Sequence, residues 1–495
     1  MPKWWSKYSI IAYVLALAVV TYMYSAYSMP WYYMLSGVVA VSVFFWYGRQ
    51  VAKQTSVLKM HREKSFEKIL FWNAFVIRVL WMGMIYYIFM ESYGNPFGFE
   101  NADADYYDNM GGEVAQWLSR GTFFRDWGHW SVERKGDLSD MGYATYVGFI
   151  YWLTGEGGSV HAPMIAGQVV KTSAISIIAV RLLKCVWSSL TVLLIYRLAK
   201  RNFDEQTARI AGIFVALWPN FWYYCGVHLK ETEMVFMAVL FVEQADKMLR
   251  SRQFTSWKVV PVLLIAAAMF TFRTPLGLVA LLALIFSVVM SSARVVNWGK
   301  RIIIGVLAVL LVGVTVGNRI EERAKGLIEQ VQMGQQKSNM EWRSKREHGN
   351  AYAKYASKTI FAPLIMTIPF PSMVRPFDGQ DVQQLLNGGN FVKNIMSFFT
   401  IFALITLLLS GKWRDHLLPL SFMLGYLVVL TVSVFAQSER FHQPAMPFEM
   451  MFAAYGLGMV VPKKKYKRWF MYWCVLMFIA AIAWNWFKLK GRGLS

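Results

Sequence analysis

Charged residues are scarce in this chain, and cysteines are scarcer still. Asp, Glu, Lys and Arg make up 16% of the 495 residues, against roughly 25% in a typical soluble domain. The three cysteines, Cys185, Cys225 and Cys474, are widely separated and lie in or beside apolar runs. This spacing gives no disulfide framework and no cysteine metal site, so we expect buried thiols with a packing role.

Apolar residues, by contrast, are abundant and make up 56% of the sequence. This share is high for a soluble protein and indicates a polytopic membrane protein. The net charge of +22 would point to nucleic acid in a soluble domain, but here the Lys and Arg residues gather in short clusters between apolar blocks. Such clusters are typical of loops that face an anionic cytoplasmic leaflet, so we expect membrane lipids and no nucleic acid as partners.

Thirteen apolar runs are candidate membrane spans, which need about 17–25 residues each. They are residues 8–27, 31–47, 69–91, 179–198, 207–226, 229–248, 257–272, 275–291, 301–317, 395–410, 416–436, 442–461 and 469–487. The first follows Lys3 and Lys7 in the charge order of a signal peptide, but it is too long for one and is expected to be a retained span. The sequence therefore predicts an all-α polytopic membrane protein of about thirteen helices.

The basic clusters predict the orientation of these spans. Six clusters fall on one side if every run is a single crossing, and the positive-inside rule makes that side cytoplasmic. They are residues 49–68, 197–201, 247–258, 294–301, 412–416 and 463–468. The basic tail, residues 488–492, is the exception because it would end outside.

Two long polar segments, residues 92–178 and 318–394, then lie on the outer face. Loops of this length are usually functional. Residues 143–153 are too short to span and are expected to form a helix at the membrane interface. The chain is thus divided into five parts: N-terminal spans 1–91, first outer loop 92–178, central spans 179–317, second outer loop 318–394 and C-terminal spans 395–495.

An acidic cluster stands out at the start of the first outer loop. Four carboxylates fall between Glu100 and Asp108, among them Asp103 and Asp105. A carboxylate that is partly desolvated at a membrane edge has a raised pKa and is a plausible general base. A solvated acidic loop and a divalent-cation site are the alternatives, because an Asp-x-Asp pattern alone is a weak signal.

Several basic groups are predicted to reach the same outer face. His228 and Lys230 lie between two spans, Arg273 lies in a short outer break, and Arg440 lies before another span. Charged groups at a membrane edge are costly and often mark function, although each alone could anchor a helix end or form a local ion pair. Together they have the chemistry that a phosphate group requires.

Two motifs of the first outer loop, and several later segments, resemble those of a known family. Asp105-Tyr106-Tyr107, followed by Asp140-x-Gly142-Tyr143, resembles the first outer loop of GT-C glycosyltransferases, in particular the bacterial branch related to protein O-mannosyltransferases and aminoarabinose transferases. The segments 181–183, 195–203, 216–220 and 228–231 continue the resemblance, which reappears in 439–447. The order of these patterns is more specific than any one of them.

This resemblance implies a GT-C-like helical bundle and a glycosyltransferase. The donor would be a sugar linked to a polyprenyl phosphate, and the acceptor would be a lipid, a glycan or a protein on the periplasmic face of a bacterial inner membrane, in cell-envelope polysaccharide biosynthesis. A divalent cation is a candidate cofactor. The implied site residues are the base Asp105 or Asp103, with Asp140 as second acid; Lys230, Arg273, Arg440 and His228 for the donor phosphate; and Tyr106, Tyr107, Tyr143 and Arg375 for the acceptor or sugar.

Two other functions fit parts of the same pattern. A polysaccharide polymerase or ligase would also use lipid-linked glycans and outer-loop arginines such as Arg375. A lipid-linked glycan transporter or flippase would carry ionisable groups near the bilayer midplane and an inverted repeat. No internal repeat is found, and the ionisable groups lie at span ends, so glycosyl transfer is preferred.

Overall fold

The computed structural model describes residues 1–57, 63–97, 102–134, 137–155, 173–251, 256–292, 335–345, 349–376, 385–433 and 435–494, together with positions 295, 296, 299 and 306. Across these ranges the chain is helical, and its one β contact is a single bridge between Ser28 and Val374. The expected all-α polytopic fold is confirmed.

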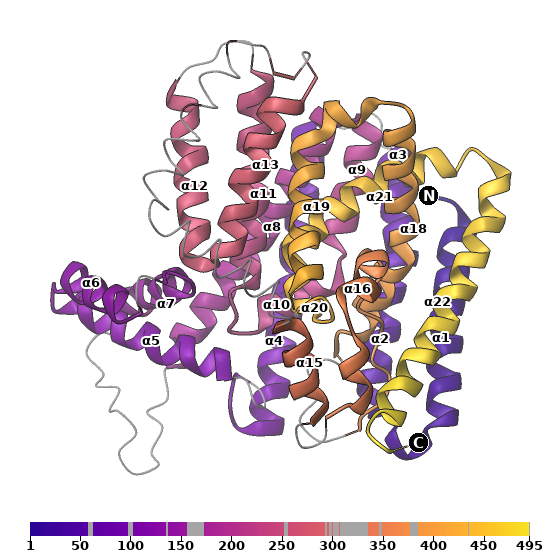
Figure 1. The fold of residues 1–495 in the computed structure, drawn as a ribbon, viewed down its shortest axis with the longest axis horizontal. Coiled ribbons are helices and arrows are strands. Elements are labelled where there is room, and N and C mark those ends of the chain that lie inside the picture. Colours follow the sequence, from indigo (N-terminus) through magenta and orange to yellow (C-terminus); the bar gives the residue numbers. More distant parts are fainter. Residues whose placement is uncertain are drawn as a thin grey trace.

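The long helices form a bundle in which the two ends of the chain lie at one edge (Figure 1). Its main members are α1 (Lys3–Met23), α2 (Trp31–Ser42) continued by α3 (Gly48–Val57), α4 (Glu63–Tyr93), α8 (Ala174–Asn202), α11 (Glu231–Arg250), α12 (Val259–Phe272), α13 (Thr274–Met290), α18 (Asn387–Leu409), α19 (Leu417–Val432), α21 (Met446–Val460) and α22 (Lys464–Lys490). Among the described residues, seven segments are long and apolar enough to cross a membrane: those of α1, α2–α3, α4, α8, α18, α19 and α22. The apolar helices α12 and α13 are shorter.

The expected span over 207–226 is not one helix. It is divided into α9 (Glu205–Ala216) and α10 (Pro219–Gly226). Pro219 has no N–H to donate, and its ring disfavours helical backbone at Trp218, which is extended (ψ 116°). The expected span over 301–317 lies outside the described residues, apart from Val306.

The break between α9 and α10 is stabilised by a buried arginine from α4. Arg78 is fully buried, and its guanidinium donates to the carbonyl oxygens of Val215 (3.2 Å) and Ala216 (3.0 Å). It also donates to Ser188 Oγ at 2.7 Å. A cation at a helix C-terminus satisfies carbonyls that have no helical partner and complements the helix dipole. Arg78 thus fixes the place where α10 begins.

Three further helices, α5 (Ala102–Ser119), α6 (Phe123–Glu133) and α7 (Met141–Leu153), form a layer at one end of the bundle and run across the long helices (Figure 1). The expected helix over 143–153 is confirmed as α7. It packs closely on α5, since a Cβ added to Gly148 would lie 2.5 Å from Val114 and 2.7 Å from the carbonyl oxygen of Gly111. This contact holds α5 in place over the outer end of the bundle.

The described part of the second outer segment also packs against this end. It contains α15 (Gln335–Lys345) and α16 (Lys358–Leu364), and short α20 (Glu439–His442) lies in the turn between α19 and α21. The basic tail packs here too: Lys488 donates to Ser372 Oγ, and the Gly491 carbonyl accepts from Ala351 N at 2.7 Å. These contacts account for a basic tail at the end opposite the basic loops.

Candidate functional site

Two residues of α5 face the bundle from the start of the helix. Asp103 and Tyr107 are one turn apart, so they lie on the face that continues to Gly111 and the contact with α7. Asp105 points elsewhere: its residue is exposed, and among the described residues no hydrogen bond or ion pair involves its carboxylate. Partial burial raises the pKa of Asp105.

Asp140 stands at the start of α7 in a strained backbone conformation. Its φ is 74°, and in the described ranges it is the one non-glycine residue with a left-handed backbone. Such a conformation costs about 1–3 kcal/mol and is often found at functional sites. The Asp140 carboxylate accepts from the Tyr107 hydroxyl at 2.9 Å and from the Lys230 ammonium group. Burial raises the pKa of Tyr107, so its hydroxyl remains a donor.

Lys230 and Glu231 come from the short connection between α10 and α11. Lys230 is buried, and besides Asp140 its ammonium group donates to the carbonyl oxygen of Phe272 at 3.0 Å. The Glu231 carboxylate is fully buried, and one of its oxygens accepts from Arg440 Nε. The connection therefore delivers a cation and an anion side by side.

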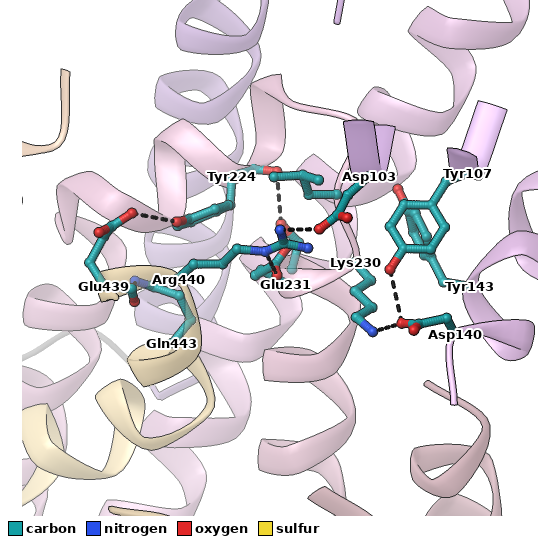
Figure 2. A network of polar contacts seen from close by, with 12 residues as sticks. Asp103, Tyr107, Asp140, Tyr143, Tyr224, Lys230, Glu231, Glu439, Arg440 and Gln443 are labelled. Carbon is teal, nitrogen blue, oxygen red and sulfur yellow. Dashed lines mark hydrogen bonds and ion pairs between the residues drawn. The ribbon is translucent and has the colours of Figure 1, made fainter. Parts of the chain in front are cut away.

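Arg440 joins these elements. From α20 it reaches both Glu231, through Nε, and Asp103, through Nη1 (Figure 2). Its side chain is 19% exposed, whereas that of Asp103 is 54% exposed. The second pair shows the same difference in exposure, since the side chain of Lys230 is 7% exposed and that of Asp140 is 32% exposed. In both pairs the cation is therefore the more buried partner, and the carboxylate lies nearer to the solvent-exposed side, which is called the open side below.

The side chains of Asp103, Asp140, Lys230, Glu231 and Arg440 form one charged cluster. Arg273 adds a third cation to it. It caps the end of α12, and its guanidinium carbon lies 4.0 Å from the ring centre of Phe441 and 5.6 Å from that of Phe435. Its Nη1 is buried and has no hydrogen-bond partner among the described residues. A buried donor without a partner is costly, which marks this guanidinium as available to a ligand.

The remaining predicted residues lie around the cluster or away from it. Tyr143 is fully buried and packs edge-on against Tyr107, with ring centres 4.8 Å apart. Tyr106 accepts from Arg134 at 3.1 Å. His228 is fully buried against aromatic rings and lies 3.4 Å from the Tyr151 hydroxyl. It does not face the cluster in the described contacts.

Arg375 lies elsewhere on the outer end. Its backbone N–H donates to the Tyr27 carbonyl at 2.7 Å, beside the bridge between Ser28 and Val374. This contact ties the second outer segment to the turn between α1 and α2. In the described contacts, Arg375 is not joined to Arg440 or Lys230.

Sequence reasoning missed Lys184, which positions the cluster from α8. This fully buried ammonium group donates to the Leu229 carbonyl and to the Tyr143 hydroxyl (3.2 Å), and it lies 3.4 Å from the Glu233 carboxylate. It thereby holds the connection that carries Lys230. A lysine within an apolar run was the signal that could have revealed it.

The carboxylates of the cluster do not form a metal centre in this arrangement. Within the described ranges, no group of three or more His, Cys, Asp or Glu side chains converges as metal ligands do. Asp103 and Asp140 each face a cation, Arg440 and Lys230, and a divalent ion at these oxygens would be repelled by both. The described residues in this arrangement therefore do not fit a divalent cation.

Part of the chain is similar to a family of known proteins. The family model "dolichyl-phosphate-mannose-protein mannosyltransferase" matches residues 161–317, which is less than half of the chain. No curated protein matches. A crystal structure of the Archaeoglobus fulgidus oligosaccharyltransferase, in complex with Zn and sulfate, is similar at 10% identity and a TM-score of 0.36. The similarity covers 72% of this chain and 44% of that one, and at this TM-score it carries no argument.

The matched segment contains α8 to α13, which carry Lys184, Lys230, Glu231 and Arg273. The mannosyltransferase model thus coincides with the part of the chain that supplies most of the buried charges of the cluster. Over residues 161–317 the chain is thus similar to the dolichyl-phosphate-mannose-protein mannosyltransferases, in agreement with the GT-C resemblance seen in the sequence and with the all-α polytopic fold.

Proposed function

We propose that this enzyme transfers a glycosyl group from a polyprenyl-phosphate- or polyprenyl-pyrophosphate-linked donor to a lipid, glycan or protein acceptor, and that the cluster at the outer end of the bundle is its active site. One observation carries the proposal: two cations, the buried Lys230 and the largely buried Arg440, are each paired with a more exposed carboxylate. Glycosyl transfer from a lipid phosphate requires both kinds of group.

The ion pairs suggest how the donor would enter. A donor phosphate that reaches Arg440 and Lys230 offers them several anionic acceptor oxygens, which can take the place of the carboxylate oxygens of Asp103 and Asp140. The carboxylates, which are more exposed, are released toward the open side, where an acceptor hydroxyl would approach. The cations thus exchange their carboxylate partners for the donor phosphate, and this exchange frees the carboxylate that acts as base.

The transfer step then balances within this set of groups. A carboxylate takes the proton of the acceptor hydroxyl, whose oxygen forms the new bond to the anomeric carbon. The bond from that carbon to the phosphate oxygen breaks, and its electron pair leaves with the lipid phosphate. Arg440, Lys230 and Arg273 stabilise the charge that develops there, which is the kind of contribution that preorganised cations make to catalysis.

The contacts favour Asp103 as the base, because its carboxylate lies in the cluster while that of Asp105 does not. The order expected from the sequence, with Asp105 first, remains a prediction. Asp140 is held by Lys230 and Tyr107 and is suited to orienting the acceptor or the sugar. Tyr106, Tyr143, His228 and Arg375 remain predicted contributors.

The charge distribution supports a location in a bacterial inner membrane, with the cluster on the periplasmic face. The predicted cytoplasmic clusters 197–201, 412–416 and 463–468 lie at helix ends on the side where α1 begins, and α5 to α7 lie toward the opposite end, beside the bundle (Figure 1). The division into spans 1–91, 179–317 and 395–495 with outer segments 92–178 and 318–394 also remains a prediction.

The proposal is tested with purified protein and a panel of polyprenyl-phosphate sugars, by measuring release of lipid phosphate. Asp103→Asn and Asp105→Asn are compared with wild type, and Glu133→Gln, an exposed acid on α6, is the matched control. We expect Asp103→Asn to slow transfer by about 10²–10⁴-fold and the control to be unaffected. Wild-type rates in both aspartate variants would refute Asp103 and Asp105 as the base. Substrate accumulation in vesicles that survives Asp103→Asn would indicate a transporter.

A further inference from the structure

In α1 and α22, which both begin at the other end of the bundle, the charges are one-sided. Residues 1–62 and 450–495 contain no Asp or Glu. The described parts of these two stretches include α1, α2, α3, α22 and most of α21, and the basic run Lys463 to Arg468 lies at the start of α22. Positive charge here has no acidic partner within either stretch, so its counter-charge must come from elsewhere.

Two hollows lie at this end, where α1 and α22 begin together at the edge of the bundle (Figure 1). The first has a volume of about 520 Å³ and is lined by Trp4, Tyr8, Val461, Lys463, Lys467, Arg468 and Met471. The second, which has a volume of about 460 Å³, is an open hollow along α22 alone and is lined by Lys465, Arg468, Trp469 and Tyr472. Both volumes are in the range of small-molecule sites, about 300–1,000 Å³. Arg468 lines both hollows and so connects them.

The helices are held together below these hollows, which makes the site a fixed feature. Trp4 of α1 packs against Phe470 of α22 with ring centres 5.2 Å apart. On α22 the Lys465 ammonium group lies 5.7 Å from the Trp469 ring centre. Cations next to aromatic rings at a membrane edge are suited to a phosphate that is attached to a hydrocarbon body.

The surface next to the hollows favours a lipid as the ligand. Exposed apolar side chains continue along α22 from Tyr472 through Val475 and Leu476 to Ile479. These positions are three or four residues apart, so they form one ridge that begins at Arg468. A free phosphate would use the cations alone, whereas a phospholipid would use both the cations and the ridge.

We propose that the α1–α22 hollows bind the headgroup of an anionic phospholipid, with its acyl chains along the apolar ridge of α22. Lys467 and Arg468 bind the phosphate, and Trp4, Tyr8 and Tyr472 enclose the glycerol region. The site is separate from the cluster around Arg440, so the bound lipid is a structural ligand and not the sugar donor.

The test is binding of phosphatidylglycerol to the full chain in detergent, measured by native mass spectrometry with phosphatidylcholine as the neutral comparison. The double variant Lys467→Gln/Arg468→Gln is compared with Lys412→Gln/Arg414→Gln, which removes the same charge from another basic turn at the same end. We expect the first pair to weaken phosphatidylglycerol binding by tenfold or more and the second to change it less than twofold. The charge-preserving pair Lys467→Arg/Arg468→Lys should retain binding, which excludes misfolding as the cause.

Glycosyl transfer in detergent should be unchanged in the Lys467→Gln/Arg468→Gln variant, because these residues are not part of the active site. Equal loss in both double variants would overturn the proposal in favour of general charge attraction. Equal binding of phosphatidylcholine would also overturn it, as would full displacement of the lipid by inorganic phosphate. None of these outcomes bears on the transfer reaction, so failure here leaves the proposed function standing.

Discussion

Replacing Arg440 by glutamine separates the structural role of the cluster from its chemical role. In the wild-type protein Arg440 neutralises Glu231, whose carboxylate is fully buried. Arg440→Gln leaves that carboxylate without a counter-charge, and breaking a buried pair in this way costs about 3–5 kcal/mol. Asp103, the other partner of Arg440, is 54% exposed, so Asp103→Asn should cost no more than about 1 kcal/mol.

The double variant Arg440→Gln/Glu231→Gln then makes the reasoning testable. With both charges gone, the buried site contains two amides, and most of the lost stability should return. Activity should not return, because the cation that would bind the donor phosphate is still absent. Stability is measured by thermal unfolding in one detergent, and activity by release of lipid phosphate.

Two results would refute this account. If the double variant is as unstable as Arg440→Gln, the buried charge on Glu231 is not what Arg440 compensates. If Asp103→Asn lowers stability more than Arg440→Gln does, the exposed pair is the structural one. A double variant that regains activity along with stability would instead show that Arg440 has no role in the reaction.

Three further predictions follow from the same contacts. Lys230→Gln should lower kcat/KM by about 10²–10³-fold in the lipid-phosphate assay, with partial rescue by Lys230→Arg. Burial raises the pKa of Asp105, so the folded state favours the protonated carboxyl, and stability falls as pH rises through the folded pKa. Asp105→Asn should therefore raise the melting temperature at neutral pH. The gain should be smaller at acidic pH, where the wild-type carboxyl is protonated. Arg78→Met should destabilise the protein by about 3 kcal/mol by leaving buried carbonyls unpaired, whereas Arg197→Met, which breaks the exposed pair with Glu67, should cost less than about 1 kcal/mol; both are read from thermal unfolding.

The sequence predicted the helices well because their signal is local. Long apolar runs identify α1, α4 and α22, and the short run 143–153 identifies α7. The same reasoning failed at 207–226, where composition is uniformly apolar but Pro219 ends the helix and Arg78, from a distant part of the chain, stabilises the break. Apolar periodicity contains no information about such a partner.

The candidate site was predicted as a set of residues and not as an arrangement. Lys230, Arg440 and the aspartates of α5 were named because charges near span ends are costly. Their pairing is not visible in the sequence, since Asp103 and Arg440 are 337 residues apart. For the same reason Lys184 was overlooked, and Glu231 was expected only as a local ion-pair partner of Lys230: each appears ordinary until the neighbours from other helices are known.

The cluster has no surplus charge, and this bears on which donor suits it. Its three carboxylates, Asp103, Asp140 and Glu231, balance its three basic side chains, Lys230, Arg273 and Arg440. A sugar linked through one phosphate brings one negative charge, whereas a pyrophosphate linkage brings two. We therefore expect the proposed site to favour a monophosphate-linked sugar, and competition between the two donor types for the same protein would measure that preference directly.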